Sequence, residues 1–286
     1  MRVIKRRKGR REYYYLQYSF REDGRVVTRE KYIGKQLPNN IDLIREELEA
    51  VAKKGLYSKL EQIRDEFQKE WKRYPLSAKE RELKEIAISF TYNTNAIEGS
   101  TITLEETREI LEEGVAPKKP LKEVEETESH AQVFLEMIKL KQAISNDLLL
   151  RWHREIFGKT KSDIAGRYRN YSVRVGNYIA PDWRSIHKMM NDLIFFINNS
   201  RLNAVDLAAR AHYQFERIHP FGDGNGRIGR LLMNYMLWRK GYPMIIVEYK
   251  NRSSYYKAFE KDEDHFVKYF IRRYISVHKK RISSNT

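Results

Sequence analysis

Two apolar helical stripes on either side of one glycine-rich loop constrain the fold of this chain most strongly. The residues of the first stripe are Leu207, Ala208, Ala211, Phe215 and Ile218, and those of the second are Ile228, Leu231, Leu232, Tyr235 and Leu237. Gly241 and Pro243 follow the second stripe and end it. The pattern predicts two core helices, over 203–218 and 226–240, that hold the loop between them rigidly.

Helical periodicity continues through most of the remaining chain. It predicts further helices over 39–76, 77–95, 103–114, 121–142, 146–157, 183–199 and 252–280, the last of them interrupted. Two capping-box patterns, Ser77–Glu80 and Thr103–Glu106, indicate where two of these helices begin. The fold class that we expect is therefore mainly α.

Two segments depart from the helical pattern. Residues Tyr13–Phe20 and Val26–Ile33 are β-prone and flank a turn at Glu22–Gly24, which predicts a small N-terminal β-hairpin module. Residues 166–181 alternate β-branched or aromatic side chains with polar ones, which predicts a second, short hairpin. No repeat or Gly/Ser linker divides the chain. We therefore expect a β-hairpin extension over 1–38, a helical linker region over 39–76, a helical region over 77–114 and a helical core with C-terminal helices over 115–286.

Composition limits the classes of function. The 286 residues contain no cysteine, which excludes a disulfide framework, a thiolate metal site and a cysteine nucleophile. No uncharged apolar run approaches the roughly 20 residues that a membrane-spanning helix needs. The N-terminus also lacks the apolar stretch of a signal peptide. We expect a cytoplasmic protein with no membrane partner.

The net charge of +16 is concentrated at the two ends. Residues 1–11 contain seven Lys or Arg and residues 266–286 contain six, with no Asp or Glu in either tract. Such tracts can bind phosphate backbones in a salt-dependent way, so nucleic acid is a candidate partner. Because residues 1–76 show no helix-turn-helix or other reader pattern, we interpret both tracts as solvated tails.

The loop His219–Arg230 combines groups suited to phosphate chemistry. Peptide N–H groups around Gly224–Gly226 can point outward where a helix begins, which forms an anion site. Arg227 and Arg230 follow in the next turn, and two guanidinium groups there could grip more than one phosphate.

Two residues of the loop could supply the chemistry itself. Asp223 is a suitable oxygen ligand for a Mg²⁺ ion shared with a diphosphate. His219 can accept a proton at neutral pH, which typically contributes about 10²–10⁴-fold in rate. The set indicates phosphoryl or nucleotidyl transfer to a hydroxyl.

Two other interpretations of this segment stay open. Asp-Gly and Asn-Gly pairs are common in ordinary turns, so the loop could simply join two helices. His212, Glu216 and His219 fall at i, i+4 and i+7 on one helix face and could bind zinc, although no further histidine is placed to complete the site. The GxxxxGK(S/T) pattern of a P-loop is absent.

The segment His219–Arg230 resembles the signature of the Fic family, HPFx(D/E)GNGRxxR, at every specified position. The hairpin at 166–181 is similar to the flap of that family, and Tyr255–Tyr256 match aromatic residues that members place near the adenine. The resemblance covers roughly residues 77–275. It implies a Fic-type helical bundle that transfers AMP from ATP, with Mg²⁺ as cofactor, to a Ser, Thr or Tyr hydroxyl of a target protein.

The resemblance also implies roles for individual residues. His219 would deprotonate the target hydroxyl, Asp223 would hold Mg²⁺, and Phe221 would anchor the loop in the core. The nucleotide would be bound by Gly224, Asn225, Gly226, Arg227 at the β-phosphate, Arg230 at the γ-phosphate, and Tyr256. The flap, with Val173, Val175 and Gly176, would align the target protein by strand addition.

A second motif bears on regulation. Residues Thr94–Gly99 resemble the inhibitory pattern (S/T)xxxE(G/N) of members that carry it on a helix N-terminal to the core, called class II. There Glu98 would pair with Arg230 as a carboxylate–guanidinium fork and turn ATP away from its productive pose. The simpler interpretation is that Glu98 only ends a helix before Gly99.

Four questions stay open at the level of sequence. In some relatives the same glutamate aligns a water that removes AMP, so Glu98 could serve a predominant or bifunctional deAMPylase. Other relatives transfer phosphocholine or UMP, whereas the unaltered motif here favours AMP. A third reading is a nucleotide-sensing, nucleic-acid-binding regulator. Many relatives form homodimers, but no feature of this sequence fixes the oligomeric state.

Overall fold

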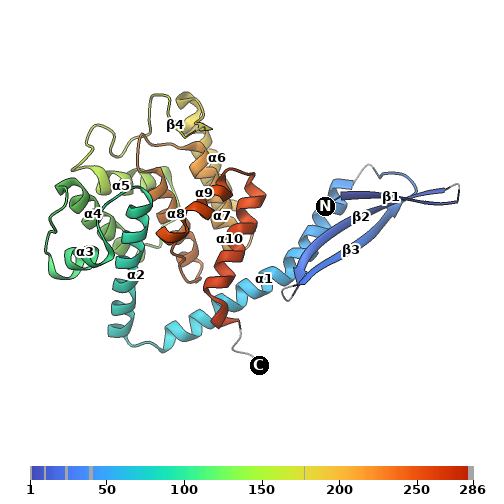
Figure 1. Cartoon of the computed structure of the whole chain (residues 1–286), viewed down its shortest axis with the longest axis horizontal. Coiled ribbons are helices and arrows are strands. Elements are labelled where there is room, and N and C mark those ends of the chain that lie inside the picture. The colour runs from blue at the N-terminus through green and yellow to red at the C-terminus, as the bar shows by residue number, and fades with distance from the viewer. Residues whose placement is uncertain (1, 10, 23–24, 39–40, 177, 283–286) are drawn as a thin grey trace. The chain divides into compact units, whose positions relative to one another are not determined.

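The N-terminal segment forms a three-stranded antiparallel sheet (Figure 1). The computed structural model describes residues 2–9, 11–22, 25–38, 41–176 and 178–282. It divides into two compact units, Met1–Gln62 and Ile63–Thr286, with the boundary inside helix α1. The strands of the sheet are β1 (Arg2–Lys8), β2 (Arg11–Glu22) and β3 (Arg25–Gly34), in the order β1-β2-β3.

The prediction of a hairpin captured β2 and β3 but missed β1. The basic tract that we interpreted as a solvated tail is largely this strand, paired with β2 from Arg2 opposite Gln17 to Lys8 opposite Arg11. Charged side chains are common on edge strands, and most residues of β1 are exposed. Leu16 is fully buried on one side, against Val3, Ile33 and Ile44.

Helices make up most of the remaining structure, as predicted. They are α1 (Ile41–Arg73), α2 (Leu76–Ile97), α3 (Leu104–Arg108) with the π-turn η1 (Glu109–Glu113), α4 (Leu121–Met137), α5 (Asn146–Phe157), η2 (Trp183–Ser185), α6 (Ile186–Asn199), α7 (Ala204–Ile218), α8 (Asn225–Arg239), η3 (Tyr249–Asn251), α9 (Arg252–Phe259), α10 (Glu263–Val277) and η4 (Lys279–Arg281). No helix in the described part of the chain is long and apolar enough to cross a membrane.

Several helix ends differ from the prediction. The capping box at Thr103 forms: its hydroxyl accepts from the Glu106 N–H at 3.2 Å, and the Glu106 carboxylate accepts from the Thr103 N–H at 2.8 Å. The predicted box at Ser77 was wrong, because α2 begins one residue earlier after Pro75, without a side-chain cap. Proline suits a helix start, since the N–H that it lacks has no partner there.

Helix α4 ends at Met137, five residues before the predicted end. Side chains from α8 take over the backbone carbonyls that follow it. The Trp238 indole N–H donates to the Ile138 carbonyl at 3.0 Å, and the Tyr235 hydroxyl donates to the Gln142 carbonyl at 2.7 Å. These partners lie about a hundred residues away in sequence, so local periodicity could not reveal them.

The C-terminal basic tract is also not a tail. Most of it forms α10, which buries Phe266, Phe270 and Tyr274. Arg273 pairs with Glu248 at 2.8 Å, and Arg281 pairs with Glu70 at 2.7 Å. The tract therefore packs into the helical unit through its aromatic side chains, and two of its cations are already paired.

Helix α8 is the centre of the helical unit (Figure 1). It contacts α7, α2 and α5, and most of its side chains are buried. Packing on several sides fixes both its position and the loop that leads into it. That loop, residues 219–224, is the segment that the sequence singled out.

Candidate active site

The loop between α7 and α8 is fixed by its own side chains. The Asn225 amide oxygen accepts from the Phe221 N–H at 2.8 Å, and its amide nitrogen donates to the Phe221 carbonyl at 2.9 Å. The Phe221 ring is fully buried and stacks on His153 at 3.9 Å between centroids. The Asn225 side chain thus shapes the loop.

Glycine is required at two positions where this loop meets α8. Gly224 precedes α8 with a φ of 78°, and a Cβ there would lie 2.4 Å from the Phe157 ring. A Cβ on Gly226 would lie 2.1 Å from Oε1 of Glu98. The missing side chain therefore lets a carboxylate reach the first turn of α8, where helix N–H groups favour an anion.

Glu98 reaches the first turn from the end of α2 and binds Arg230. Its Oε1 lies 2.6 Å from Nη2 of Arg230, whose side chain is only 1% exposed. The same guanidinium donates to the Thr94 carbonyl at 3.1 Å and to the Thr94 hydroxyl at 3.3 Å. The predicted pairing is present, through one carboxylate oxygen and one guanidinium nitrogen.

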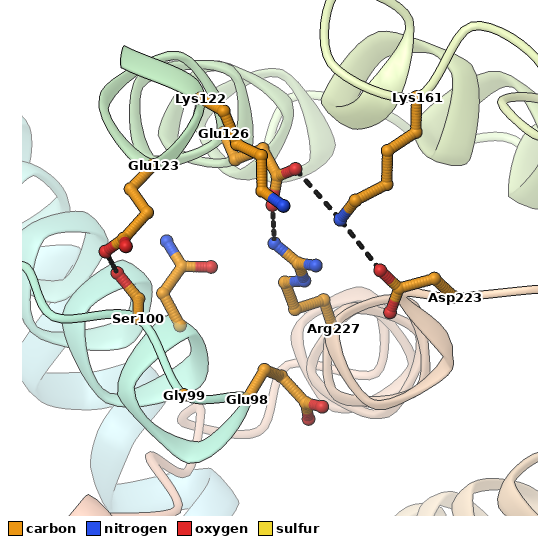
Figure 2. A pocket seen from close by; sticks show the side chains of 10 residues that line it. Glu98, Gly99, Ser100, Lys122, Glu123, Glu126, Lys161, Asp223 and Arg227 are labelled. Atoms are coloured by element: carbon orange, nitrogen blue, oxygen red, sulfur yellow. Dashed lines mark hydrogen bonds and ion pairs between the residues drawn. The ribbon is translucent and has the colours of Figure 1, made fainter. Parts of the chain in front are cut away.

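Arg227 belongs to a second ion-pair network (Figure 2). Its Nη1 donates to Glu126 of α4, and its guanidinium lies 4.3 Å from the centroid of the Phe157 ring. Lys161 bridges Glu126, at 2.9 Å, and Asp223, at 2.7 Å. The four side chains form one chain of alternating charge: Arg227, Glu126, Lys161 and Asp223.

A cavity of about 220 Å³ opens beside this network (Figure 2). Its lining includes Glu98 and the four residues of the network, together with Asn95, Gly99, Ser100, Lys122 and Glu123. His219 and Arg230 do not line it. The cavity is polar and bordered by charged groups of both signs.

His219 ends α7 in an unusual backbone conformation. Its φ is 51°, and it is the sole non-glycine residue with a positive φ in the ranges that the structure describes. Burial is the main cause that lowers its pKa below the usual 6.5, and the nearby Arg169 cation adds to this, while Glu98 and Asp223 oppose it. The imidazole is therefore neutral at pH 7 and able to accept a proton.

The Asp223 carboxyl is ionised at neutral pH. Burial raises its pKa, but the ion pair with Lys161, the charge of Arg227 and the Gly224 N–H outweigh this and lower the pKa below 3.8. The side chain is 50% exposed. An ionised, accessible carboxylate beside a polar cavity can bind a cation.

The predicted flap is shorter than expected. Its strands β4 (Arg174–Val175) and β5 (Tyr178–Ile179) have two residues each, and Asn177 lies outside the described residues. Gly176 turns between them with a φ of 57°, and the Val173 carbonyl accepts from the Ala180 N–H at 3.1 Å. Val175 is exposed, so the edge of this hairpin is open to solvent.

The two neighbouring tyrosines, Tyr255 and Tyr256, lie in different environments. The Tyr256 hydroxyl donates to the Ile97 carbonyl at 3.3 Å, next to Glu98, whereas Tyr255 is buried and forms a hydrogen bond with His212.

Among the described residues, no group of three or more His, Cys, Asp or Glu side chains could hold a metal ion. The grouping of His212, Glu216 and His219 was therefore wrong, since His219 leaves the helix in a left-handed conformation.

Comparison with known proteins agrees with this geometry. A profile of the Fic/DOC family matches residues 143–237. The protein adenylyltransferase Fic of Nematostella vectensis is 36% identical over 200 residues, which are 67% of this chain and 47% of that protein. The protein adenylyltransferase fic-1 of Caenorhabditis elegans is 33% identical over 71% of this chain and 41% of that protein.

Solved structures give the same result. A Fic domain containing signaling protein from Bacteroides thetaiotaomicron matches with a TM-score of 0.68 and 26% identity, over 80% of this chain and 98% of that one. C. elegans Fic-1 matches with a TM-score of 0.69 and 28% identity, over 87% of this chain and 78% of that one. The fold, the loop and the relatives agree. Residues 143–237 of this chain belong to the Fic/DOC family.

The chain spans less than half the length of the curated relatives that it matches, 47% and 41% for the two named above. The matched segment includes α5, the flap, α6, α7 and the first thirteen residues of α8. Glu98, Thr94 and Glu126 lie outside this segment, on α2 and α4.

Three residues of the candidate site were not predicted from sequence. Glu126 and Lys161 hold Arg227 and Asp223, as described above. Arg169 ties the flap segment to the loop, because it donates to the carbonyls of His219, at 2.8 Å, and Pro181, at 2.8 Å. Glu126 shares the buried face of α4 with His130 and Val133, at i+4 and i+7, but the sequence does not show which glutamate of this helix is buried.

Proposed function

We propose that this chain transfers AMP from ATP to a Ser, Thr or Tyr hydroxyl of a target protein, and that Glu98 restrains this reaction. The observation that carries the proposal is the placement of Glu98. Its carboxylate lies against the first turn of α8 and on the buried Arg230, where an anionic phosphate would bind. The adenylyltransferase names of the relatives support AMP as the transferred group.

The reaction requires one proton acceptor and one leaving group. The target oxygen attacks the α-phosphorus of ATP and the bond from that phosphorus to the β-phosphate oxygen breaks, so pyrophosphate leaves. His219 accepts the hydroxyl proton at its neutral imidazole, whose lowered pKa keeps it unprotonated at pH 7. Asn225 and Arg169 hold the loop that carries His219, so the base is already positioned before the reaction begins.

The nucleotide phosphates would bind at the start of α8. Gly224 and Gly226 leave the helix N-terminus open to an anion, and Arg230 would bind the terminal phosphate once Glu98 has moved away. Arg227 would contact the β-phosphate from its position against Phe157 and Glu126. Tyr256, which lies beside the end of α2, would contact the base.

The residues around Asp223 fit a magnesium ion. Its carboxylate already binds a cation, the Lys161 ammonium, and lines the polar cavity. Mg²⁺ is usually held by one or two carboxylates together with substrate phosphates, so Asp223 would hold it. When bound, the ion would neutralise phosphate charge.

The flap would align the target. The exposed edge that includes Val175 and Gly176 can pair with an extended target segment through main-chain hydrogen bonds, with Val173 at its base. Such pairing tolerates varied target sequences, so it fixes the position of the hydroxyl and leaves the identity of the target open.

Removal of AMP is the alternative direction for the same site. The Glu98 side chain is 29% exposed, so water can reach its carboxylate beside Arg230. A water held there could hydrolyse a modified target. In that case Glu98 would be required for activity instead of opposing it.

Intact-protein mass spectrometry after incubation with ATP and Mg²⁺ tests the proposal. We expect added mass equal to AMP that is greatest in Glu98→Gly, small in the wild type and absent in the double variant Glu98→Gly with His219→Ala. Glu82→Ala, which changes an exposed glutamate of α2, is the matched control and should behave as wild type. No adduct in Glu98→Gly, with ATP still bound, would overturn AMP transfer.

A further inference from the structure

The N-terminal sheet has one covered side and one open side. Residues that face each other across an antiparallel pair project to the same side. The register places Arg6 opposite Tyr13, Ile4 opposite Tyr15, and Tyr15 opposite Tyr32. We call this the open side; its residues are Arg2, Ile4, Arg6, Lys8, Arg11, Tyr13, Tyr15, Gln17, Ser19, Thr28, Glu30 and Tyr32.

The other side of the sheet carries the small core of this unit. Leu16 is 0% exposed, and Val3, Ile33 and Ile44 of α1 pack on it. Lys5 on that side is paired with Glu12 at 2.7 Å. This covered side of the sheet therefore stabilises the fold of the unit.

Three tyrosines form the centre of the open side. The Tyr32 ring lies between the other two, with centroid distances of 6.2 Å to Tyr13 and 5.4 Å to Tyr15. Tyr32 is 49% exposed. Cross-strand aromatic pairs do stabilise thin sheets, so their presence alone does not indicate a ligand.

The charge around the tyrosines indicates what they bind. Residues 2–38 contain twelve basic and four acidic residues, a net charge of +8. On the open side, Arg2, Lys8 and Arg11 surround the tyrosines, while Arg6 lies 5.2 Å from the Tyr15 ring and pairs with Glu30 at 2.7 Å. With four cations, Arg2, Arg6, Lys8 and Arg11, and one carboxylate, Glu30, the open side has a net positive charge that attracts a polyanion.

We infer that the open side of the N-terminal sheet binds single-stranded nucleic acid. Phosphates would contact the basic side chains along β1 and at Arg11, and unpaired bases would stack on Tyr32 and its neighbours. Duplex bases are already stacked on each other, and other polyanions lack flat aromatic faces, so neither would use the exposed ring. This function is independent of the proposed transferase activity, since it needs neither ATP nor α8.

Fluorescence anisotropy with the full chain tests this inference. The probe is a labelled oligothymidylate of about 12 nucleotides, a typical site size for such surfaces. The competitors are the matching duplex and heparin, each titrated between about 50 and 200 mM salt. We expect the single strand to bind at least tenfold more tightly than either competitor, with an affinity that falls steeply as salt rises.

Substitutions on the open and covered sides of the sheet separate the contribution of base stacking to binding from that of charge. Tyr32→Leu keeps a β-prone apolar side chain and should weaken binding about 5–150-fold, the equivalent of 1–3 kcal/mol for one stacked base. Tyr32→Phe keeps the ring and should bind as wild type. Arg11→Ala should reduce the slope of log affinity against log salt by about 0.7, whereas Arg7→Ala on the covered side should change it much less.

Three results would overturn the inference. One is equal or tighter binding to the duplex or to heparin. Another is wild-type affinity in Tyr32→Leu with an unchanged circular dichroism spectrum. The third is an equal effect of Arg7→Ala and Arg11→Ala, which would mean that net charge, and not the open side, attracts the oligonucleotide.

Discussion

Arg227 and Arg230 lie one turn apart on α8, and each binds a glutamate from another helix, but solvent reaches the two pairs differently. The Arg227 and Glu126 side chains are 7% and 8% exposed. In the other pair Arg230 is 1% exposed, while Glu98 is 29% exposed. Both side chains of the Arg227–Glu126 pair, which we call the closed pair, are thus buried. In the Arg230–Glu98 pair the carboxylate is accessible to solvent.

The two glutamates also differ in how firmly their backbones are held. Glu126 lies within α4 and accepts from Arg227, Lys161 and Thr160 together. Glu98 follows the last residue of α2, and Gly99 after it has a φ of 92°, which ends the helix. A residue at a helix end can move without breaking the helix. Glu126 is therefore suited to hold Arg227 in place, and Glu98 to leave Arg230.

The largest expected difference concerns stability. Glu126→Ala leaves the buried Arg227 without a counter-charge, so we expect the free energy of unfolding to fall by on the order of 3–5 kcal/mol. Glu98→Ala should cost only about 1–2 kcal/mol, because water can enter through the space that Glu98 vacates. Urea unfolding of both variants measures this. Glu126→Gln, which keeps the shape and one acceptor, is the control, and equal losses in the two alanine variants would contradict the comparison.

This contrast also shows which contacts the sequence could predict. The pairing of Glu98 with Arg230 was predicted because both residues belong to recognisable motifs. Glu126 was not, because it lies 101 residues from Arg227 in a helix that contains several other glutamates. Only the packing of α4 against the helices around it decides which of them is buried.

The same reasoning applies to the fold. The start of α3 was predicted because its cap, Thr103, and Glu106 are three residues apart. The end of α4 was not, because Trp238 and Tyr235 of α8 determine it. Strand β1 was missed because a run of basic residues has no apolar alternation, although pairing with β2 makes it a strand.

The second expected difference concerns activity and rests on the proposed function. Glu98→Gly should raise the rate of AMP incorporation roughly 5–150-fold, the usual range for a coupling between two binding events. Glu98→Gln, which can still accept from Arg230, should fall between the wild type and Glu98→Gly. Glu126→Gln should not activate at all. The rates are measured with labelled ATP, and activation by Glu126→Gln would show that both pairs exclude the nucleotide.

A smaller effect is expected at Lys161, which joins the closed pair to Asp223. Its ammonium would compete with Mg²⁺ for the Asp223 carboxylate, which is 50% exposed. An ion pair at such an accessible carboxylate contributes at most about 1 kcal/mol, so Lys161→Ala should lower the Mg²⁺ concentration for half-maximal activity up to about fivefold. The titration is done in the Glu98→Gly background, with Lys122→Ala as the control from the same cavity. An unchanged or higher Mg²⁺ requirement would mean that Lys161 does not compete.

The smallest expected effect is on the pH dependence of the reaction, and it again separates the two glutamates. The pKa of His219 lies below 6.5, chiefly through burial, so activity should persist below pH 6.5 and be lost as the pH falls through that lowered pKa. The negative charge of Glu98 raises the pKa of His219 and so partly offsets burial. Glu98→Gln should therefore move the acid limb, the fall in rate toward low pH, to still lower pH. Glu126 is not among the groups that shift the pKa of His219, so Glu126→Gln should leave the acid limb unchanged. An acid limb at or above pH 6.5 would show that His219 is not the base.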